Sequence, residues 1–518
     1  MDLLQMAVFL GLCAIALGWL ARHFDFPYPI ALVIGGAALG FVPRLPQFAF
    51  DPELILTLVL PPILYQAAVL TSWRDFKLGM RTIGLLAVGL VVVTTLAVGA
   101  ALKLLIPDIP WAVAFVFGAI VSPPDAVAAT AILSRLNIPR HVVTVLEGES
   151  LVNDASGLVL YKFTVAAALT GVFSLLDALG QFAGVSIGGI ALGFITGLAF
   201  IYVHRRVGDV FIEVLISLVT PYVAYVVAES LHVSGILAVV VAGLVHGRHS
   251  PVVVSSEMRI LSRSMWSVLV FMLNTVVFVL MGMQLSDSVE RMQGYSALRL
   301  VAEGAMLSAV AIVVRFAWVY AALYLPRRLS AWPRREAAPP EAEYFIMSWC
   351  GMRGIVSLAA ALALPLALGD GTPFPYRDAI VFFTFVVIAS TLVLQGLTLP
   401  ALIRKLHVGT DWSLQEEQKN ARRAMSRAAL AAIDLLAGRE GAAPDLAARI
   451  GAEFTEKVAD EVPDAVMSEH EADLSRRLRR AAIQAQRQEL IRIWRENQIN
   501  DEVLHQFEEE LDYHEAHV

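Results

Sequence analysis

The chain has 518 residues, of which 57% are hydrophobic and 16% are charged, and it carries a net charge of −7. Soluble proteins contain about 25% charged residues, so this composition excludes a protein built around one soluble core. It indicates a polytopic membrane protein that is embedded in the lipid bilayer and binds no nucleic acid. The two cysteines, Cys13 and Cys350, both lie in apolar runs, which excludes a disulfide framework and a cysteine metal site.

Thirteen apolar runs follow one another along the chain, and each is a candidate membrane helix because about 20 mostly apolar residues span a bilayer. The first run has no positive region before it and no polar domain after it, so we expect a helix there and not a cleaved leader. The runs cover residues 3–21, 27–42, 52–70, 81–105, 110–134, 142–169, 173–203, 209–230, 232–247, 265–283, 299–325, 343–368 and 376–403.

The Lys and Arg residues in the connecting segments predict the orientation of these helices. Segments after odd-numbered runs hold 15 of them, whereas segments after even-numbered runs hold 5. Positive residues concentrate on the cytoplasmic side of a plasma (inner) membrane protein. We therefore expect the N-terminus outside and the C-terminal tail inside.

The tail, residues 406–518, is predicted to be a second domain after the membrane domain, residues 1–405. From Asp411 onward the chain has 23 acidic and 14 basic residues, so the tail is acidic. Charged amphipathic patterns at 413–437 and 465–497 predict helices. We expect this helical cytoplasmic tail to be regulatory.

The fifth run is interrupted by the segment VSPPDAVAAT, Val121–Thr130. Pro123 and Pro124 donate no backbone hydrogen bond, so the helix must break or kink and free the carbonyl groups just before them. Unwound backbone inside a membrane persists only inside protein or beside a polar cavity, where free carbonyls can coordinate a cation. Asp125 would face the positive end of the second half-helix. A simple proline kink with Asp125 as a local cap is the alternative.

The twelfth run contains SWCGMRGIVSLAAALALP, in which Arg353 lies between two glycines about ten residues inside the run. An arginine at that depth needs a counter-charge, although snorkelling to the interface is an alternative. The two interrupted runs are seven apart and therefore cross the membrane in opposite directions. This predicts two inverted six-helix repeats, joined by the seventh run, with the broken helices 5 and 12 crossing at the midplane of an alternating-access transporter.

The sixth run contains GESLVNDASG, Gly148–Gly157. A carboxylate at membrane depth costs at least roughly 2.5 to 3.5 kcal/mol, so Asp154 is the first functional candidate. Ser150 lies on the same helical face, and a hydroxyl beside a carboxylate suits a small, hard cation. Competition of proton and cation for Asp154 would give one-for-one exchange. The alternative is an ion-paired structural acid, but the nearest following basic residue, Lys162, is two turns away.

A neighbouring stripe of the same helix carries Glu149 and Asn153. We expect Glu149 to be the counter-ion of Arg353, because such a pair neutralises both groups without occupying the ion site.

Three motifs occur in order: SPPDAVA in the fifth run, GESLVNDA in the sixth and GMRGIVSLA in the twelfth. Together they resemble the motifs of the monovalent cation/proton antiporters, in the sodium/proton exchanger branch of prokaryotic NhaP-like type. The resemblance covers residues 1–405 and leaves the tail outside. It implies a homodimer with separate dimerisation and core domains, elevator-like movement of the core and, because the family's asparagine–aspartate pair is present, electroneutral exchange.

The resemblance also implies roles for single residues. The implied ion ligands are Asp154, Asp125, Ser150 and the backbone carbonyl of Pro124. Asn153 would organise the unwound crossing, and Glu149 and Arg353 would form a structural ion pair. Many prokaryotic members have a glutamate where Gln66 stands in LPPILYQAA, which leaves one charge fewer near the site and the ion preference open.

The predicted function is exchange of Na⁺, with Li⁺ as a further candidate, for H⁺, with no cofactor and no enzymatic activity. A K⁺/H⁺ exchanger of the same fold is the main alternative. A cation channel is less favoured, and it would conduct with Asp154 neutralised. A hydrolase using Ser150 is disfavoured, because the motif lacks the glycine of a nucleophile elbow and His141 is the only histidine in or beside the run.

Overall fold

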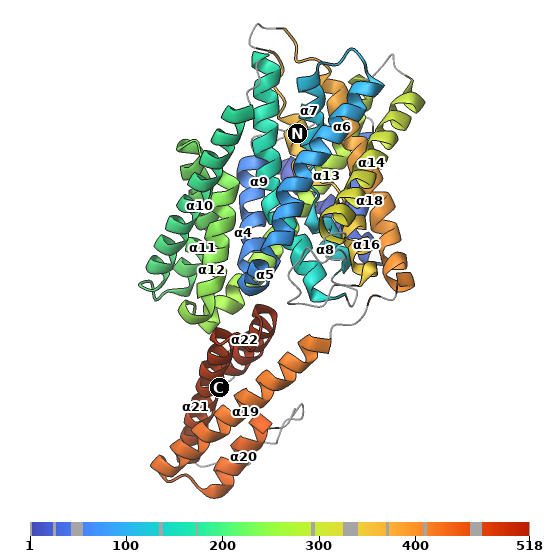
Figure 1. Ribbon diagram of the computed structural model, residues 1–518. Coiled ribbons are helices and arrows are strands. Elements are labelled where there is room, and N and C mark those ends of the chain that lie inside the picture. The colour runs from blue at the N-terminus through green and yellow to red at the C-terminus, as the bar shows by residue number, and fades with distance from the viewer. Residues whose placement is uncertain are drawn as a thin grey trace.

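The computed structural model describes residues 3–23, 27–42, 55–133, 138–171, 175–291, 296–324, 340–368, 372–406, 408, 412–455 and 469–516, and these residues are almost entirely helical. A bundle of helices stands above a smaller helical tail (Figure 1). The bundle consists of α1 (Leu3–His23), α2 (Tyr28–Gly40), η1 (Ile55–Val59), α4 (Leu60–Leu70), α5 (Trp73–Gly84), η2 (Leu85–Leu90), α6 (Val91–Leu105), α7 (Trp111–Val121), α8 (Ala126–Leu133), α9 (Arg140–Thr170), α10 (Leu175–His204), α11 (Val210–Ser230), α12 (Gly235–Val253), α13 (Ser256–Arg291), α14 (Ala297–Val319), η3 (Tyr320–Tyr324), α16 (Glu341–Trp349), α17 (Ile355–Leu362) and α18 (Arg377–Leu406).

Seven helices within the described ranges are long and apolar enough to cross a membrane. They are Trp73–Leu105, Gly180–His204, Val210–Ser230, Gly235–Val253, Ser256–Leu285, Leu298–Tyr324 and Arg377–Leu406. Shorter apolar helices cover Gly11–Ala21, Tyr28–Gly40, Thr57–Leu70 and Trp111–Val121. The all-helical fold is confirmed, while the count of thirteen crossings stays a prediction.

The helix of the fourth run begins at Trp73 and not at residue 81 as expected. The Ser72 hydroxyl caps it by accepting a hydrogen bond from the backbone N–H of Asp75 at 3.3 Å. The basic residues Arg74 and Lys77 therefore belong to the first turns of the helix and not to a loop.

Both predicted interruptions are present. The fifth run forms α7 and α8, separated by residues 122–125, and the twelfth forms α16 and α17, separated by residues 350–354. The two prolines end α7 because they cannot continue its hydrogen bonds, and the glycine-rich segment CGMRG ends α16.

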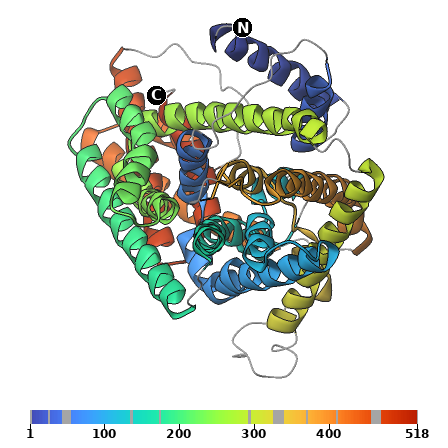
Figure 2. The same ribbon diagram turned by 90° about the horizontal axis from the view of Figure 1, so that it is seen from above.

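The helices of the bundle pack mainly within two groups. In the first group α2 lies along α13, and α12 packs against α4, α10 and α11. In the second group α6 and α9 pack against α7, and α14 packs against α6 and α18. Figure 2 shows α10 to α12 in green along one side of the bundle, with the blue α6 and the olive α14 on the other. We call these the α12 group and the α7 group.

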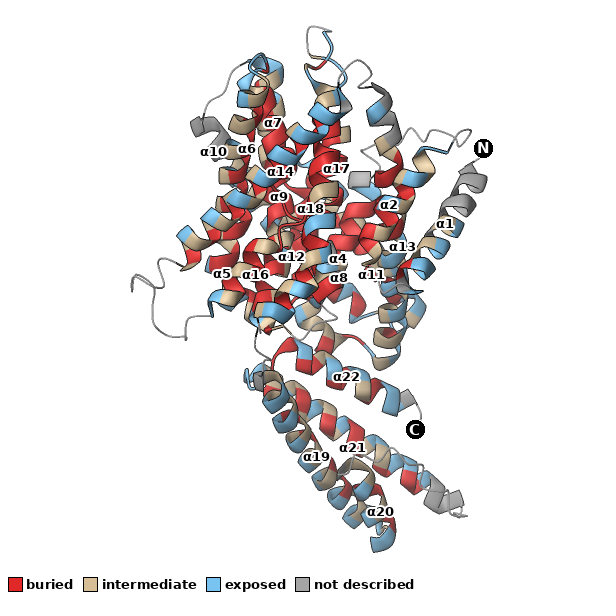
Figure 3. Ribbon diagram, turned by 90° about the vertical axis from the view of Figure 1, so that its right-hand side faces the viewer, coloured by how far each residue is buried: buried red, intermediate tan, exposed pale blue. Residues whose placement is uncertain are grey.

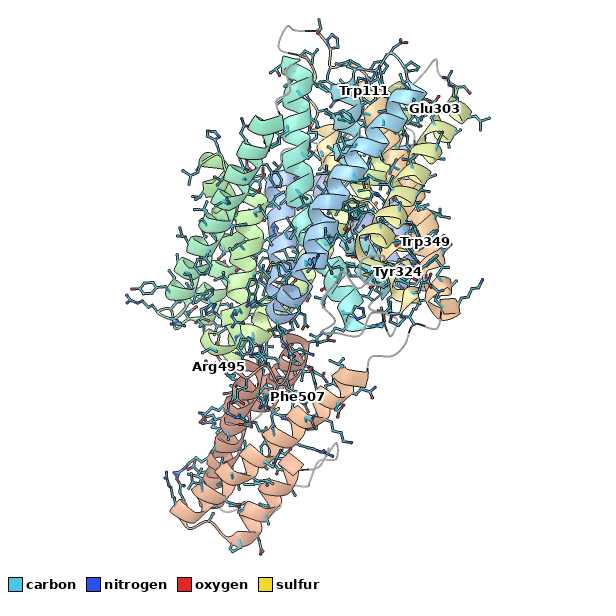
Figure 4. The ribbon with its side chains drawn as sticks, viewed as in Figure 1. Trp111, Glu303, Tyr324, Trp349, Arg495 and Phe507 are labelled. Atoms are coloured by element: carbon cyan, nitrogen blue, oxygen red, sulfur yellow. The ribbon has the colours of Figure 1, made fainter. Side chains whose placement is uncertain are left out.

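Large aromatic side chains lie toward both ends of the bundle. Trp111, at the start of α7, lies near the end away from the tail, whereas Tyr324 and Trp349 lie toward the tail (Figure 4). Trp and Tyr are enriched where membrane helices leave the hydrocarbon region. These positions agree with a bundle that crosses a bilayer.

The tail forms α19 (Trp412–Glu440), α20 (Pro444–Thr455), α21 (Glu469–Arg495) and α22 (Asp501–Ala516). The predicted helices at 413–437 and 465–497 correspond to α19 and α21, which pack through apolar residues such as Met425, Ile433, Leu478 and Leu490. Figure 3 shows α22 between the bundle and the rest of the tail.

Candidate ion-binding site

The two interrupted helices meet where both are unwound. The backbone N–H of Asp125 donates a hydrogen bond to the Met352 carbonyl at 2.7 Å and joins the two breaks directly. Ser122 Oγ donates to the freed carbonyl of Ala119 at 3.0 Å. A protein hydroxyl thus satisfies one of the carbonyls that the prolines release, as unwound chain in a membrane requires.

Four helix ends lie at this crossing, and two side chains of opposite charge complement them. Asp125 directly precedes α8, and its Oδ2 accepts the N–H of Ile355, the first residue of α17, at 3.4 Å. Arg353 Nε donates to the carbonyl of Val121, the last residue of α7, at 3.1 Å, and its Nη1 donates to Gly351 just beyond α16. An anion at helix N-termini and a cation at C-termini are the favourable arrangement.

Glycine is required at position 354. A Cβ atom there would lie 1.6 Å from Asp125 Oδ2, closer than any non-bonded contact. Gly157 of α9 has a similar role, because its Cβ would lie 3.0 Å from the Pro123 ring. Glycine at 354 thus lets the two breaks meet, and glycine at 157 lets Pro123 pack closely against α9.

Glu149 does not pair with Arg353, so that prediction was wrong. Its carboxylate accepts two hydrogen bonds from Arg315 of α14, at 2.5 Å from Nη1 and 2.8 Å from Nη2. Both side chains are only 1% exposed, and Arg315 also donates to the Met347 carbonyl from Nε and Nη2. The planar guanidinium matches the carboxylate bidentately, and Arg353 is instead balanced by the carbonyls at helix ends.

Asn153 links α9 to the first break. Its Nδ2 donates to the Pro124 carbonyl at 2.9 Å, and its side chain is fully buried. Its neighbour Ser156 donates to the carbonyls of Ala87 and Asn153. Asn153 therefore engages one of the two lone pairs of the Pro124 carbonyl.

A cavity of about 210 Å³ lies beside the crossing. Its walls come from α4, α8, α9, α17 and the break between α7 and α8. Its polar lining residues are Thr71, Asp125, Thr130, Glu147, Ser150, Asp154 and Ser357. Glu147 is two turns from Asp154 toward Arg140, which contacts the tail. The cavity thus extends from Asp154 toward the tail-facing end of the bundle.

Asp154 is 6% exposed and lines this cavity. Among the described residues, none forms an ion pair or a hydrogen bond with its carboxylate, and a second acid, Asp125, lines the same cavity. A buried, unpaired carboxylate beside a polar cavity is costly unless a proton or a cation neutralises it. The arrangement is therefore suited to binding one or the other.

The sequence profile described as "Sodium/hydrogen exchanger, transmembrane" matches residues 9–405. The chain belongs to this family of secondary transporters. An uncharacterised Na⁺/H⁺ exchanger of Mycobacterium tuberculosis is 34% identical over 516 residues, which cover 97% of this chain and 94% of that protein. The match to the Mycobacterium tuberculosis protein extends into the tail, because it covers 97% of this chain whereas the family profile ends at residue 405.

Two further relatives carry more specific names. A sodium, potassium, lithium and rubidium/H⁺ antiporter of Bacillus pumilus is 35% identical over 416 residues, covering 78% of this chain and 62% of that protein. A Na⁺/H⁺ antiporter of Aphanothece halophytica is 31% identical over 384 residues, covering 74% of this chain and 70% of that protein.

The fold of the present chain is also similar to that of a solved structure. The sodium proton antiporter MjNhaP1 from Methanocaldococcus jannaschii superposes with a TM-score of 0.63 at 21% identity, covering 78% of this chain and 99% of that chain. This likeness identifies a helical membrane antiporter fold.

The structure of this exchanger brings four predicted residues to the cavity: Asp125, Ser150, Asp154 and Pro124. Gln66 is half-buried on α4 and is not among the lining residues, whereas its neighbours Ile63, Leu64 and Ala67 are. Within the described ranges no three His, Cys, Asp or Glu side chains group to hold a metal ion.

Three further residues of the exchanger were not identified from the sequence. Arg315 lies inside the apolar run 299–325, which is the same signal that identified Arg353. Glu147 lies three residues before Ser150 and shares its side of the helix, so the pattern could also have found it. Ser357 has no signal in the sequence, because serine is common in membrane helices.

Proposed function

We propose that this exchanger moves one Na⁺ against one H⁺ by alternating access, with cation and proton competing for Asp154. The observation that supports it best is the contrast on α9: Arg315 neutralises Glu149, whereas the Asp154 carboxylate in the cavity has no ion pair among the residues that the structure describes. One unpaired carboxylate carries either one proton or one monovalent cation. Exchange through it is electroneutral, because the carboxylate makes both crossings neutralised.

Asp154 and Ser150 would hold the cation together with the second lone pair of the Pro124 carbonyl. Asp125 would contribute its charge while it complements the ends of α8 and α17. Asn153, Glu149 and Arg353 organise the site, Asn153 by holding the Pro124 carbonyl in place. Oxygen ligands of this kind suit Na⁺ and Li⁺.

The proposed architecture has thirteen crossings in two inverted six-helix repeats, with α10 as the connector, in a homodimer. One helix group would form the dimer and the other would carry the ion. An odd number of crossings would put the N-terminus and the tail on opposite sides of the membrane. We place the protein in the plasma membrane with its tail in the cytoplasm, so the cavity would open toward the cytoplasm.

A K⁺/H⁺ antiporter is the second candidate. The name of the Bacillus pumilus relative includes potassium and rubidium, so larger cations pass through a protein with this membrane domain. The same carboxylate mechanism would serve both ions, since K⁺ also takes oxygen ligands.

Purified protein in liposomes with an internal pH dye tests the proposal. An imposed pH gradient should collapse when Na⁺ or Li⁺ is added, at a rate independent of an imposed membrane potential, and Asp154→Asn should not respond. Faster collapse with K⁺ than with Na⁺ would favour the second candidate. Wild-type exchange that persists in Asp154→Asn would contradict the site.

A further inference from the structure

A second oxygen without a partner lies in the same cavity as Asp154. Ser357 of α17 lines the cavity and is 1% exposed, and its hydroxyl has no hydrogen-bond partner among the described residues. Buried hydroxyls are nearly always hydrogen-bonded, so an exception points to a bound species that satisfies it. The cavity on which Ser357 lies has room for that species.

Other hydroxyls of the bundle bond back to their own helices. Donation to a carbonyl three or four residues earlier satisfies Thr71, Thr95, Ser122, Ser156, Thr164, Ser217, Thr220, Ser348 and Thr391. Among the Ser and Thr hydroxyls in the described part of the bundle, those of Thr94 and Thr384 also lack a hydrogen-bond partner, but neither residue lines the cavity. Only Ser357 combines the two properties.

We propose that the Ser357 hydroxyl is a ligand of the transported cation. This inference rests on the proposed exchange of a monovalent cation at Asp154. The other ligands come from α9 and the α7–α8 break, so Ser357 adds a ligand from the second interrupted helix. Cations of different size need different numbers and spacings of oxygen ligands, so this hydroxyl contributes to the choice between Na⁺, Li⁺ and K⁺.

The test compares Ser357→Ala with Thr384→Val, which removes a buried, unpartnered hydroxyl away from the cavity. Exchange in liposomes gives KM and maximal rate for Na⁺, Li⁺ and K⁺, and the rise in melting temperature with added NaCl reports binding. Ser357→Ala removes one uncharged oxygen ligand of the cation, so its KM for Na⁺ should rise about three- to tenfold. Its maximal rate should hold, the selectivity between cations should shift, and Thr384→Val should behave as wild type.

Unchanged KM and selectivity in Ser357→Ala would show that the hydroxyl holds only water, and would overturn the inference while leaving the exchange at Asp154 intact. Equal effects in Ser357→Ala and Thr384→Val would also overturn it. Failure of the proposed function looks different, because the wild-type protein itself would then exchange no alkali cation.

A separate observation concerns α22 of the tail, which is bound to both helix groups of the bundle. Toward the α12 group, Asp512 accepts two hydrogen bonds from Arg259 of α13, at 2.8 and 2.6 Å, and Glu509 pairs with Arg263 of the same helix. The Asp512 side chain is 2% exposed, so this contact is well buried.

Toward the α7 group, Asp501 Oδ2 accepts a hydrogen bond from the hydroxyl of Ser72, the cap of α5, at 2.5 Å. Glu502 pairs with Arg140, the first residue of α9, at 3.2 Å. Arg140 stands at the end of the helix that carries Glu147 and Asp154, so α22 lies across the end toward which the cavity extends.

We infer that this surface of the bundle is the docking site of the acidic helix α22, and that docking restrains movement between the two helix groups. The inference rests on the proposed alternating access, which requires one group to move relative to the other. A helix anchored to α5 and α9 at one end and to α13 at the other slows such movement. Release of α22 then accelerates exchange.

The double variant Arg259→Ala/Arg263→Glu in the full chain weakens the contact of α22 with α13. It removes the pair of Arg259 with Asp512 and replaces the pair of Arg263 with Glu509 by a repulsion between two acids. Adding Glu509→Arg restores one ion pair and is the matched control. In the double variant, the backbone amides of α22 should lose protection against hydrogen–deuterium exchange, and the rate of Na⁺/H⁺ exchange in liposomes should rise about two- to fivefold. In the triple variant, the amide protection and the transport rate should both move toward their wild-type values.

Loss of α22 protection with an unchanged or lower exchange rate would overturn the restraint. Full protection of α22 in the double variant would overturn the docking site. Either result leaves the Na⁺/H⁺ exchange of the wild-type protein standing, so the two proposals fail separately.

Discussion

Glu149 and Asp154 are two buried acids on one helix, and their surroundings differ completely. Glu149 is 1% exposed and receives both arms of the Arg315 guanidinium. Asp154 is 6% exposed, lines the cavity, and has no ion pair or hydrogen bond to its carboxylate within the described residues. The first charge is compensated by the protein, whereas the second awaits compensation from outside.

Under the proposed function, this difference separates a structural acid, Glu149, from a transport acid, Asp154. A carboxylate held by a fixed cation gains nothing from a proton or Na⁺, because either would first have to displace the arginine. A carboxylate beside a cavity is neutralised by whichever cation arrives. At the crossing, Asp125 and Arg353 are also compensated by the protein, because each is hydrogen-bonded to a backbone group at a helix end.

Replacing Asp154 with asparagine should have the largest effect on transport. We expect Asp154→Asn to lose exchange to the background level while it keeps or raises its melting temperature, because an uncompensated buried charge is removed. Added NaCl should no longer raise that temperature, since the cation has lost its site. Thermal unfolding in detergent and flux in liposomes measure the two properties. A collapse of the fold would place Asp154 with the structural acids.

The sequence predicted the transport half of this comparison better than the structural half. Asp154, Ser150, Asp125 and the proline break follow from residues that are expensive or impossible in a regular membrane helix. Such a cost can be recognised locally, without knowing what lies opposite. The two broken helices were therefore predictable, and the ion site between them stays a prediction.

The partner of Glu149 was not predictable in the same way. Arg353 and Arg315 are both buried arginines in apolar runs, and sequence spacing does not say which of them faces α9. Arg353 is taken by the carbonyls of Val121 and Gly351, which only the three-dimensional crossing reveals. The contacts of α22 with Ser72 and Arg259 could not be predicted either, because they join segments far apart in the chain.

Replacing Glu149 should give the opposite signature. Glu149→Gln leaves the Arg315 charge buried and uncompensated, which costs about 3 to 5 kcal/mol of stability. We expect a clearly lower melting temperature, with exchange persisting in the molecules that remain folded. The matched control, Glu149→Leu/Arg315→Met, removes both charges and should recover more than half of the lost stability. If this double variant is folded but transports nothing, the pair takes part in transport.

Glu147 lies between the two extremes and should show the smallest effect. It is half-buried, lines the cavity two turns from Asp154 toward the tail, and so adds negative potential along the path to the site. We expect Glu147→Gln to raise the Na⁺ KM about two- to threefold from the tail side, at low ionic strength and at a pH where the Glu147 carboxylate is ionised. The maximal rate should be unchanged, because a lost steering charge slows arrival alone. An impermeant organic salt should abolish the difference by screening. Glu303→Gln is the control, since Glu303 lies near the opposite end of the bundle (Figure 4) and should leave KM unchanged. A fall in maximal rate for Glu147→Gln would mean that Glu147 binds the ion during the movement itself, and Asp154 would then share the transport role with a second acid on α9.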